Sequence, residues 1–192
     1  MRKIINSTYI TLDGVIENPQ DWPPTKDDEG AGFAVQTELL SACDAVLMGR
    51  RTYDSFAAAW PSRSGDPYSD RINSMAKYVV SSTLRRPEWN NTTVISGNVI
   101  DEIRRLKDGP GRDIVQYGFG QVSTALMEHG LLDELRLWVH PFFLGRGDPE
   151  DLLFRPRLLT RFELIEATAM KSGIAVLTYR FDPLTASAPT DA

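Results

Sequence analysis

The chain has 192 residues, of which 42% are hydrophobic and 9% aromatic, so it is long enough for one domain with a sizeable core. Its formal net charge of −5 argues against a nucleic-acid-binding protein, which would present a basic face. No stretch approaches the roughly 18 apolar residues of a membrane span, and the start of the chain lacks the apolar core of a signal peptide, so neither nucleic acid nor membrane is expected as a partner.

A strand, a long loop and a helix are predicted at the start of the chain. Residues 4–12 form the strand, which the Asp13-Gly14 turn ends. Polar residues within it predict that one edge or end of the strand is polar: Asn6, Thr8 and Thr11. Residues 17–32 form the loop, with Trp22 and the acidic residues Asp27, Asp28 and Glu29. Because an exposed loop rarely carries tryptophan, Trp22 is expected either to cover the core or to line a pocket.

Residues 33–43 are predicted to form a helix that ends near Cys43. As the only cysteine, Cys43 excludes an internal disulfide and fits a reducing, cytoplasmic compartment. Its apolar neighbours indicate a core residue rather than a nucleophile. A short strand at 45–48 and a second helix follow. The apolar face of this second helix is predicted from residues at helical spacing: Tyr53, Phe56, Ala57 and Trp60.

Strands and helices alternate over the rest of the chain. After an irregular stretch at 61–69, the predicted elements are strands at 78–80 and 92–95, a helix from Asn98 to Gly109, a strand at 113–117, a helix from Val122 to His129, a strand at 135–139, irregular residues 140–160, and hairpin strands at 162–170 and 174–181. This alternation predicts an α/β fold with a mainly parallel central sheet flanked by helices and a C-terminal antiparallel hairpin. We expect one domain over residues 1–182 and a disordered tail over 183–192.

A strand, a glycine turn and a helix start meet at residues 113–122. Gly118 and Gly120 let the backbone come close to a phosphate, and the helix start supplies N–H groups. An ordinary tight strand-to-helix turn gives the same pattern. It is not the Rossmann fingerprint, because the third glycine is missing and no acid follows at the end of a strand about 20 residues later.

Two other strand ends carry groups that suit an anion. Gly49 precedes Arg50, Arg51 and Thr52 at a helix start, and residues 78–80 run into Ser81, Ser82 and Thr83. The carboxyl ends of parallel strands share one edge of a sheet, so these groups are expected to lie together with the Gly118 turn. A solvated helix start is the alternative for the arginines, but cations are unfavourable at a helix N-terminus unless an anion joins them. A dinucleotide with an extra ribose phosphate fits this edge best.

Three segments resemble the dihydrofolate-reductase-like superfamily: residues 11–15, residues 46–53, and residues 130–137 followed by Pro141 and Leu144-Gly145. They resemble most closely the reductase (C-terminal) domain of bifunctional riboflavin-biosynthesis proteins and its stand-alone relatives. The matching segments fall in the same order over residues 2–181. No counterpart of the deaminase domain, with its zinc signature, is visible, so a stand-alone member is expected.

The resemblance implies a dihydrofolate-reductase-like sheet, NADPH as hydride donor, and a homodimer. By position, the adenosine-side phosphates would be held by Gly49, Arg50, Arg51 and Thr52, with Ser81 and Ser82 near the ribose 2′-phosphate. The residues under the pyrophosphate would be Gly118, Phe119, Gly120, Gln121 and Val122. The residues bordering the nicotinamide would be Asp13, Gly14 and Val15.

Two departures from the resemblance bear on the substrate. Dihydrofolate reductases carry an acid in the first helix, and Phe33 stands near that position here; Glu38 is the only acid of the predicted helix. Pteridine protonation by a helix carboxylate is therefore not expected, and the chain is not a dihydrofolate reductase. Basic residues that would hold a ribityl phosphate cannot be placed in this sequence.

Other candidate chemistry is sparse. The only histidines are His129 and His140, and no spacing suggests a metal site. His129 fits a structural role near a helix C-terminus. Asp13 is either a turn residue or a proton relay, which makes it the one candidate catalytic residue. Trp22 and Phe33 are the candidates for contact with a flat substrate.

The sequence therefore predicts an NADPH-dependent reductase for a small heterocyclic (pyrimidine-like or pterin-like) or carbonyl/imine substrate. A non-catalytic nucleotide-binding or metabolite-binding dimer with the same fold is the alternative. A structural dimer is a third hypothesis, with its partner surface on the 135–139 strand, around Trp138.

Overall fold

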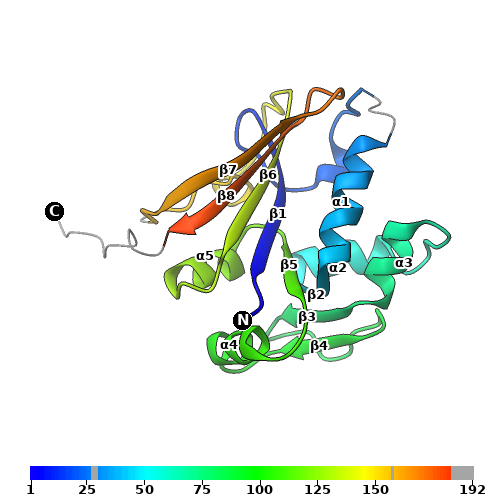
Figure 1. The fold of residues 1–192 in the computed structure, drawn as a ribbon, viewed down its shortest axis with the longest axis vertical. Helices are drawn as coiled ribbons and strands as arrows, with labels where there is room; N and C mark the ends of the chain where they lie inside the picture. Colours follow the sequence, from blue (N-terminus) through cyan, green and yellow to red (C-terminus); the bar gives the residue numbers. More distant parts are fainter. Residues whose placement is uncertain (27–29, 157, 183–192) are drawn as a thin grey trace. The chain divides into compact units, whose positions relative to one another are not determined.

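The computed structural model describes residues 1–26, 30–156 and 158–182 (Figure 1). By contact density the chain divides into two compact units. Unit 1 comprises Met1–Ile5 and Gly30–Gly118, and unit 2 comprises Asn6–Glu29 and Phe119–Ala192. The acidic residues 27–29 and the tail predicted at 183–192 lie outside the described residues. The single-domain boundary stays a prediction.

The described residues form an eight-stranded mixed sheet with five α-helices. The strand order is β4-β3-β2-β5-β1-β6-β8-β7, so the C-terminal hairpin of β7 and β8 lies at one edge. The pairs β2/β3, β2/β5 and β3/β4 are parallel, whereas β6/β8 and β7/β8 are antiparallel. The predicted fold class is therefore confirmed.

Unit 1 is a parallel sheet with helices between its strands. Strand β1 (Ile4–Thr11) begins in this unit and continues in unit 2. The other elements, in chain order, are α1 (Ala31–Ala42), β2 (Cys43–Gly49), α2 (Arg50–Ala59), α3 (Pro67–Ser74), β3 (Ala76–Val80), β4 (Thr92–Ile95), α4 (Val99–Asp108) and β5 (Asp113–Tyr117).

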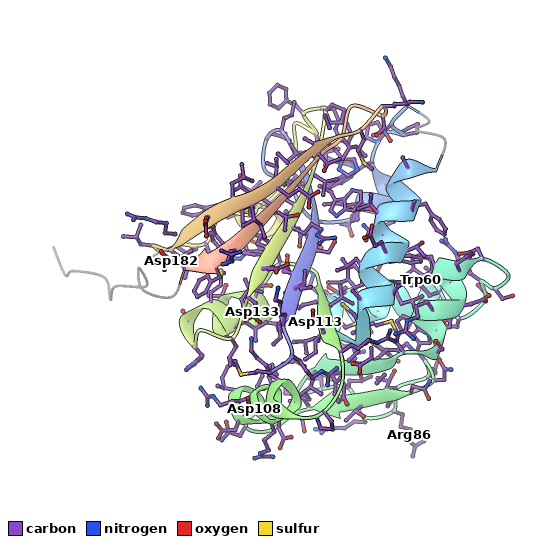
Figure 2. All side chains as sticks on the ribbon, viewed as in Figure 1. Trp60, Arg86, Asp108, Asp113, Asp133 and Asp182 are labelled. Atoms are coloured by element: carbon purple, nitrogen blue, oxygen red, sulfur yellow. The ribbon has the colours of Figure 1, made fainter. Side chains whose placement is uncertain are left out.

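Strand β2 lies at the centre of the unit 1 core, and its residues Val46, Leu47 and Met48 are fully buried. Cys43 is also fully buried, as expected of a core residue. Helices α1 and α3 lie side by side (Figure 1). Figure 2 shows Trp60 beside α3, where its ring centroid is 5.0 Å from that of Tyr68.

Helix α3 begins within the stretch for which the sequence predicts irregular structure. Asp66 caps it, since its carboxylate accepts a hydrogen bond of 2.9 Å from the Ser69 N–H, and Pro67 occupies the first helical position. An N-cap aspartate followed by proline is a local helix-start signal that needs no tertiary information. The Ser/Gly/Pro content of the preceding residues concealed this signal.

Lys77 is a fully buried cation in β3. Its ammonium donates to the carbonyls of Asn73 and Met75 at 2.9 and 2.8 Å and lies 4.5 Å from the centroid of the Trp89 ring. Burial lowers the pKa of Lys77 to about 8. Two carbonyls and an aromatic face therefore take the place of water around this charge.

Unit 2 is built on antiparallel strands that run alongside one another in Figure 1. Besides the rest of β1, it contains the short 3-10 helix η1 (Pro19–Asp21), α5 (Gln121–Glu128), β6 (Glu134–His140), the 3-10 helix η2 (Pro149–Asp151), β7 (Arg161–Ala169) and β8 (Ala175–Asp182). The hairpin turn predicted at residues 171–173 is confirmed, and Gly173 supplies its positive φ of 88°.

The burial of β6 agrees with the prediction at Leu135, which is 5% exposed, but departs from it at Trp138. Trp138 is only 2% exposed, and its indole N–H donates to Ser7 Oγ at 3.2 Å, whereas Leu137 and Val139 are half-buried. Trp138 therefore cannot be the centre of a partner surface. The polar residues of β1 are likewise buried and paired rather than at a polar edge: the Thr8 hydroxyl bonds Asn6 Oδ1 at 2.8 Å.

Two helix ends lie where the sequence predicts them and differ only in detail. His129, predicted to be the last residue of its helix, is the exposed C-cap of α5, after which Gly130 adopts a φ of 63°. Asn98 is the N-cap of α4 by position, yet its side chain donates to Asp101 rather than accepting from the backbone.

Candidate functional site

The carboxyl ends of the parallel strands of unit 1 lie together at one edge of the sheet. Gly49 is paired with Val80, Met48 with Tyr117, and Val80 with Ile95. The predicted neighbourhood of the Gly49, Ser81 and Gly118 strand ends is thus found within this unit. A fourth strand end, which was not predicted, joins them, because Ile95 leads through Ser96-Gly97 to α4.

Gly118 is required by the local packing of this edge. Its φ is +79°, and a Cβ at this position would overlap Thr52 Oγ1 from the first turn of α2. Gln116 donates a side-chain hydrogen bond of 2.6 Å to the Gly118 carbonyl, which further fixes the turn. Two predicted site residues, Thr52 and Gly118, are therefore in direct contact.

Arg50 lies between a carboxylate of its own helix and the end of β3. Its Nε is 2.8 Å from both carboxylate oxygens of Asp54, and one terminal nitrogen is 3.5 Å from Thr83 Oγ1. The ion pair with Asp54 offsets the unfavourable position of a cation at a helix start. Arg51 is exposed beside it. The structure thus supports both a ligand role and a solvated ion pair for Arg50.

The serines after β3 differ in exposure. Ser81 is buried, and its Oγ accepts from the N–H groups of Thr83 and Leu84 at 3.2 and 3.0 Å. This side chain shapes the turn, and its hydroxyl also lies 3.4 Å from Thr83 Oγ1. Ser82 is exposed at the same edge. Whether either serine contacts a ribose phosphate stays a prediction.

Residues 119–122 form the start of α5 in unit 2. Phe119 is buried, and Gly120 is the N-cap without a side chain to accept the first-turn N–H groups. A Cβ added at Gly120 would meet nothing within 4 Å among the described residues. The backbone is accessible here, and a phosphate contact at the start of α5, next to Gln121 and Val122, stays a prediction.

Asp13 links two loops of unit 2. Its carboxylate accepts hydrogen bonds from the Leu144 and Gly145 N–H groups at 3.1 and 2.8 Å and from the Thr11 hydroxyl. The Thr11 bond, followed by those from Gly145 and Leu144, lowers the pKa of Asp13 to about 2. This geometry supports the turn role, and at neutral pH an ionised Asp13 has no proton to give.

Further backbone contacts fix the same loop. Leu153 N–H donates to the Gly14 carbonyl and Ile16 N–H to that of Asp151, both at 2.8 Å. Between them, Val15 forms an isolated antiparallel bridge with Leu152. Gly14 and Val15, predicted to border a nicotinamide, are therefore held by backbone hydrogen bonds and a β-bridge to residues 151–153.

Replacing Asp13 by asparagine is expected to weaken the protein most at neutral pH. Because the folded-state pKa lies below the ordinary value of 3.8, the carboxylate stabilises the fold above that pH, and the contribution is lost as the pH falls to about 2. The difference in urea midpoint between wild type and Asp13→Asn should therefore shrink on acidification. The control is Asp21→Asn, which removes an exposed carboxylate that accepts no side-chain hydrogen bond from the described residues. A difference independent of pH would contradict this account.

Trp22 and Val15 line a cavity of about 350 Å³ in unit 2. Its remaining lining residues are Glu17, Asn18, Asp21, Leu144, Arg146, Gly147, Asp148 and Asp151. Trp22 also donates to the Glu17 carbonyl at 3.0 Å, which holds the loop in place. Both alternatives for Trp22 are therefore met, since it packs on the protein and lines a cavity.

His140 lies at the centre of an aromatic cluster in unit 2. Its ring centroid is 4.9 Å from that of Tyr9 and 5.1 Å from that of Trp22, and Nδ1 is 2.9 Å from the Trp138 carbonyl. Burial lowers the pKa of His140 below its ordinary value. A neutral, packed imidazole fits a structural role beneath the Trp22 loop.

Phe33 belongs to α1 of unit 1, whereas Trp22 belongs to unit 2. It is 47% exposed, and its ring centroid is 5.6 Å from that of Tyr68. The two candidate substrate residues thus belong to different units. Over residues 1–26, 30–156 and 158–182 there is no cluster of three His, Cys, Asp or Glu side chains that could hold a metal ion, and no helix is long and apolar enough to cross a membrane.

Residues 2–176 match the sequence profile of the RibD C-terminal domain. The chain belongs to the RibD C-terminal domain family. The chain is also 31% identical over 189 residues to YyaP, an uncharacterized protein of Bacillus subtilis (strain 168), and the match covers 94% of this chain and 96% of YyaP. The expected closeness to the C-terminal domain of riboflavin-biosynthesis proteins is thereby confirmed.

Solved structures share the fold of this RibD C-terminal domain. A protein of Shewanella sp. PV-4 named for riboflavin biosynthesis has a TM-score of 0.69 at 22% identity, over 94% of this chain and 99% of that one. The diaminohydroxyphosphoribosylaminopyrimidine deaminase/5-amino-6-(5-phosphoribosylamino)uracil reductase of Thermotoga maritima has a TM-score of 0.65 at 16% identity. The match covers 94% of this chain but 57% of the Thermotoga chain, so it spans little more than half of that protein.

Proposed function

We propose that this chain is an NADPH-dependent reductase acting on a small pyrimidine-like or pterin-like heterocycle, or on a carbonyl or imine. The carrying observation is the edge of unit 1, where four parallel strands end together and α2 begins with two arginines. Helix starts, guanidinium groups and hydroxyls at one sheet edge favour an anion with several phosphates.

The proposed cofactor contacts are taken unit by unit. In unit 1, Gly49, Arg50, Arg51, Thr52, Ser81 and Ser82 would hold the adenosine-side phosphates, with Gly118 at the end of β5. In unit 2, the bare backbone of Gly120, with Phe119, Gln121 and Val122, fits a diphosphate at the start of α5. Gly14 and Val15 would border the nicotinamide. When bound, the cofactor would supply the hydride.

The chain's own residues would contribute orientation more than acid–base chemistry. The hydrogen bonds to Asp13 keep its carboxylate ionised, so a proton for the substrate would come from water rather than from this side chain. Asp13 would instead hold the loop that carries Gly14 and Val15 in one geometry. Fixed geometry of this kind is a large part of catalysis in hydride transfer.

The cavity beside Trp22 favours a substrate that donates hydrogen bonds. Four of its lining residues are acidic and one is an arginine, and Trp22 supplies an aromatic wall. Amino groups on a heterocycle would satisfy such a lining, whereas a phosphate ester would be repelled by it. Aminopyrimidines without phosphate are therefore the first compounds to test.

A fluorescence titration with NADPH and NADH tests the cofactor assignment. Wild-type protein should bind NADPH more tightly than NADH, and it should oxidise NADPH in the presence of a substrate from a panel of pterins, pyrimidines, quinones and aldehydes. The proposal fails if neither nucleotide binds below millimolar concentration.

A non-catalytic nucleotide-binding or metabolite-binding protein is the second candidate. Helix α1 carries no acid near Phe33 and only Glu38 further on, so the helix carboxylate of dihydrofolate reductases has no counterpart there. Binding of NADPH without its consumption over the whole substrate panel would favour this candidate.

We also propose that the protein is a homodimer through one face of β6, β8 and β7. Leu137 pairs with Leu177, and Leu164 shares the row of Tyr179 and Leu135, so these apolar residues lie on the same face. Leu164 is 51% exposed, Leu137, Leu177 and Tyr179 are half-buried, and Leu135 is buried. Burying such a face between two copies would remove it from water.

Replacing Leu164 by aspartate is expected to convert the dimer to a monomer in light scattering, because a charge would be buried in the interface. Thr168→Asp is the matched control, since Thr168 pairs with Val176 and lies on the opposite face of β7. A monomeric wild-type protein would refute the dimer, and equal effects of the two variants would refute the choice of face.

A further inference from the structure

Arg155 makes an unusual set of contacts around the start of α5. One terminal nitrogen donates to the Leu152 and Phe154 carbonyls, and the other donates to the Phe119 carbonyl. The guanidinium also lies 5.4 Å from the centroid of the Phe119 ring. A side chain from the loop after η2 is therefore bound to the turn that precedes the helix.

These contacts satisfy a group that the helix itself cannot satisfy. The Phe119 carbonyl lies before the N-cap, whereas the Gly120 carbonyl already accepts from the Thr124 N–H at 3.0 Å. Arginine presents its donors in a rigid plane, so three hydrogen bonds to three carbonyls fix the angle of the turn as well as its distance. Lysine could supply the charge but not this planar arrangement.

The turn that Arg155 holds is open on its other side. Gly120 has a φ of −145° and a ψ of −144°, and a Cβ there would meet no described atom within 4 Å, so no packing contact calls for glycine. The missing side chain leaves the peptide backbone accessible just where α5 begins. Glycine at such a position lets an anion approach the first-turn N–H groups.

We infer that Arg155 is a positioning residue, which holds the Phe119-Gly120 turn open so that a diphosphate group can reach the start of α5. That the ligand group is a diphosphate rests on the proposed function, whereas the role of Arg155 in holding the turn does not. Arg155 has five N–H groups, and the two beyond the three carbonyl bonds donate to no described residue. The positive charge of Arg155 attracts the anion. Glu17 is the charged group that acts on this guanidinium.

Two ligand fragments separate positioning from general loss of structure. ADP-ribose contains the diphosphate, whereas 2′,5′-ADP carries the adenosine-side phosphates without it. Arg155→Met and Arg155→Lys should each weaken NADPH and ADP-ribose by about 10-fold or more, because the turn is no longer held. Binding of 2′,5′-ADP should change by less than about 2-fold in both variants. Arg161→Met, an exposed arginine of β7, is the control and should leave all three affinities unchanged.

Full recovery of binding by Arg155→Lys would show that charge alone matters and would overturn the inference, as would equal losses for the two fragments. If the wild-type protein binds no NADPH, the proposed function has failed, but the positioning role of Arg155 can still be tested by hydrogen exchange. Arg155→Met should then speed exchange of the Thr124 amide, which donates to the Gly120 carbonyl at 3.0 Å, at least about 10-fold relative to amides of β2. Unchanged exchange at the turn would refute the positioning role itself.

Discussion

Replacing Gly118 by alanine is expected to lower the free energy of unfolding by about 2–5 kcal/mol, a shift of roughly 5–15 °C in melting temperature. Two effects add. The φ of +79° is unfavourable for a residue with a Cβ, and that Cβ would overlap Thr52 Oγ1. Since α2 begins two residues before Thr52, relief of the overlap would also displace the helix start.

A double-mutant cycle separates these two effects. In a Thr52→Ala background the overlap is removed, so Gly118→Ala should lose only the backbone part of its cost. Gly120→Ala is the matched control, because a Cβ at Gly120 meets nothing within 4 Å. It should lower the melting temperature less than Gly118→Ala does, because only the backbone at φ −145° and ψ −144° opposes a Cβ there, while weakening NADPH. Equal destabilisation by the two alanines, measured by urea unfolding, would contradict the assignment.

Replacing Arg50 and Arg51 by alanine is expected to weaken NADPH by about 10- to 100-fold per arginine that contacts the 2′-phosphate, since a charge-assisted hydrogen bond contributes roughly 1.5–3 kcal/mol. NADH lacks this phosphate, so its affinity should change much less. The Arg50–Asp54 ion pair is exposed, and its loss alone costs about 0.3–0.5 kcal/mol. Weaker binding would therefore not result from unfolding.

Arg104→Ala is the control for this pair of variants. It removes an exposed ion pair of α4, between Arg104 and Asp101, and should leave both nucleotide affinities unchanged. An equal loss of NADPH and NADH affinity in the Arg50 and Arg51 variants would remove the 2′-phosphate assignment. An unchanged affinity would favour the solvated ion pair as the whole explanation of Arg50.

The sequence predicted those features that depend on neighbouring residues. The strand and glycine at 113–118, the helix start after Gly49 and the hairpin around Gly173 each carry their signal within about ten residues. The parallel arrangement then followed from the alternation of strands and helices. For this reason the shared edge of Gly49, Ser81 and Gly118 could be predicted from the order of residues alone.

The features that escaped prediction depend on packing between distant segments. Arg155 stands in a loop that reads as irregular, and only the folded chain brings it to Phe119. Trp138 was predicted on the polar-tolerant face of β6, yet it is buried and its indole N–H donates to Ser7 Oγ. Asp13 shows the same limit, since its partners at 144–145 lie far along the chain. Helix α3 is different, because its Asp66-Pro67 signal was local and was overlooked.

The paired loops around Asp13 have a consequence for how the protein moves. Because the amides of Ile16, Leu144 and Gly145 are hydrogen-bonded across the two loops, they can exchange with solvent only when the loops separate. Slow exchange at these three loop positions would thus report the free energy of that separation directly. The segment proposed to border the nicotinamide would then stay closed during a catalytic cycle. A motion that limits the turnover rate would have to occur in another part of the chain.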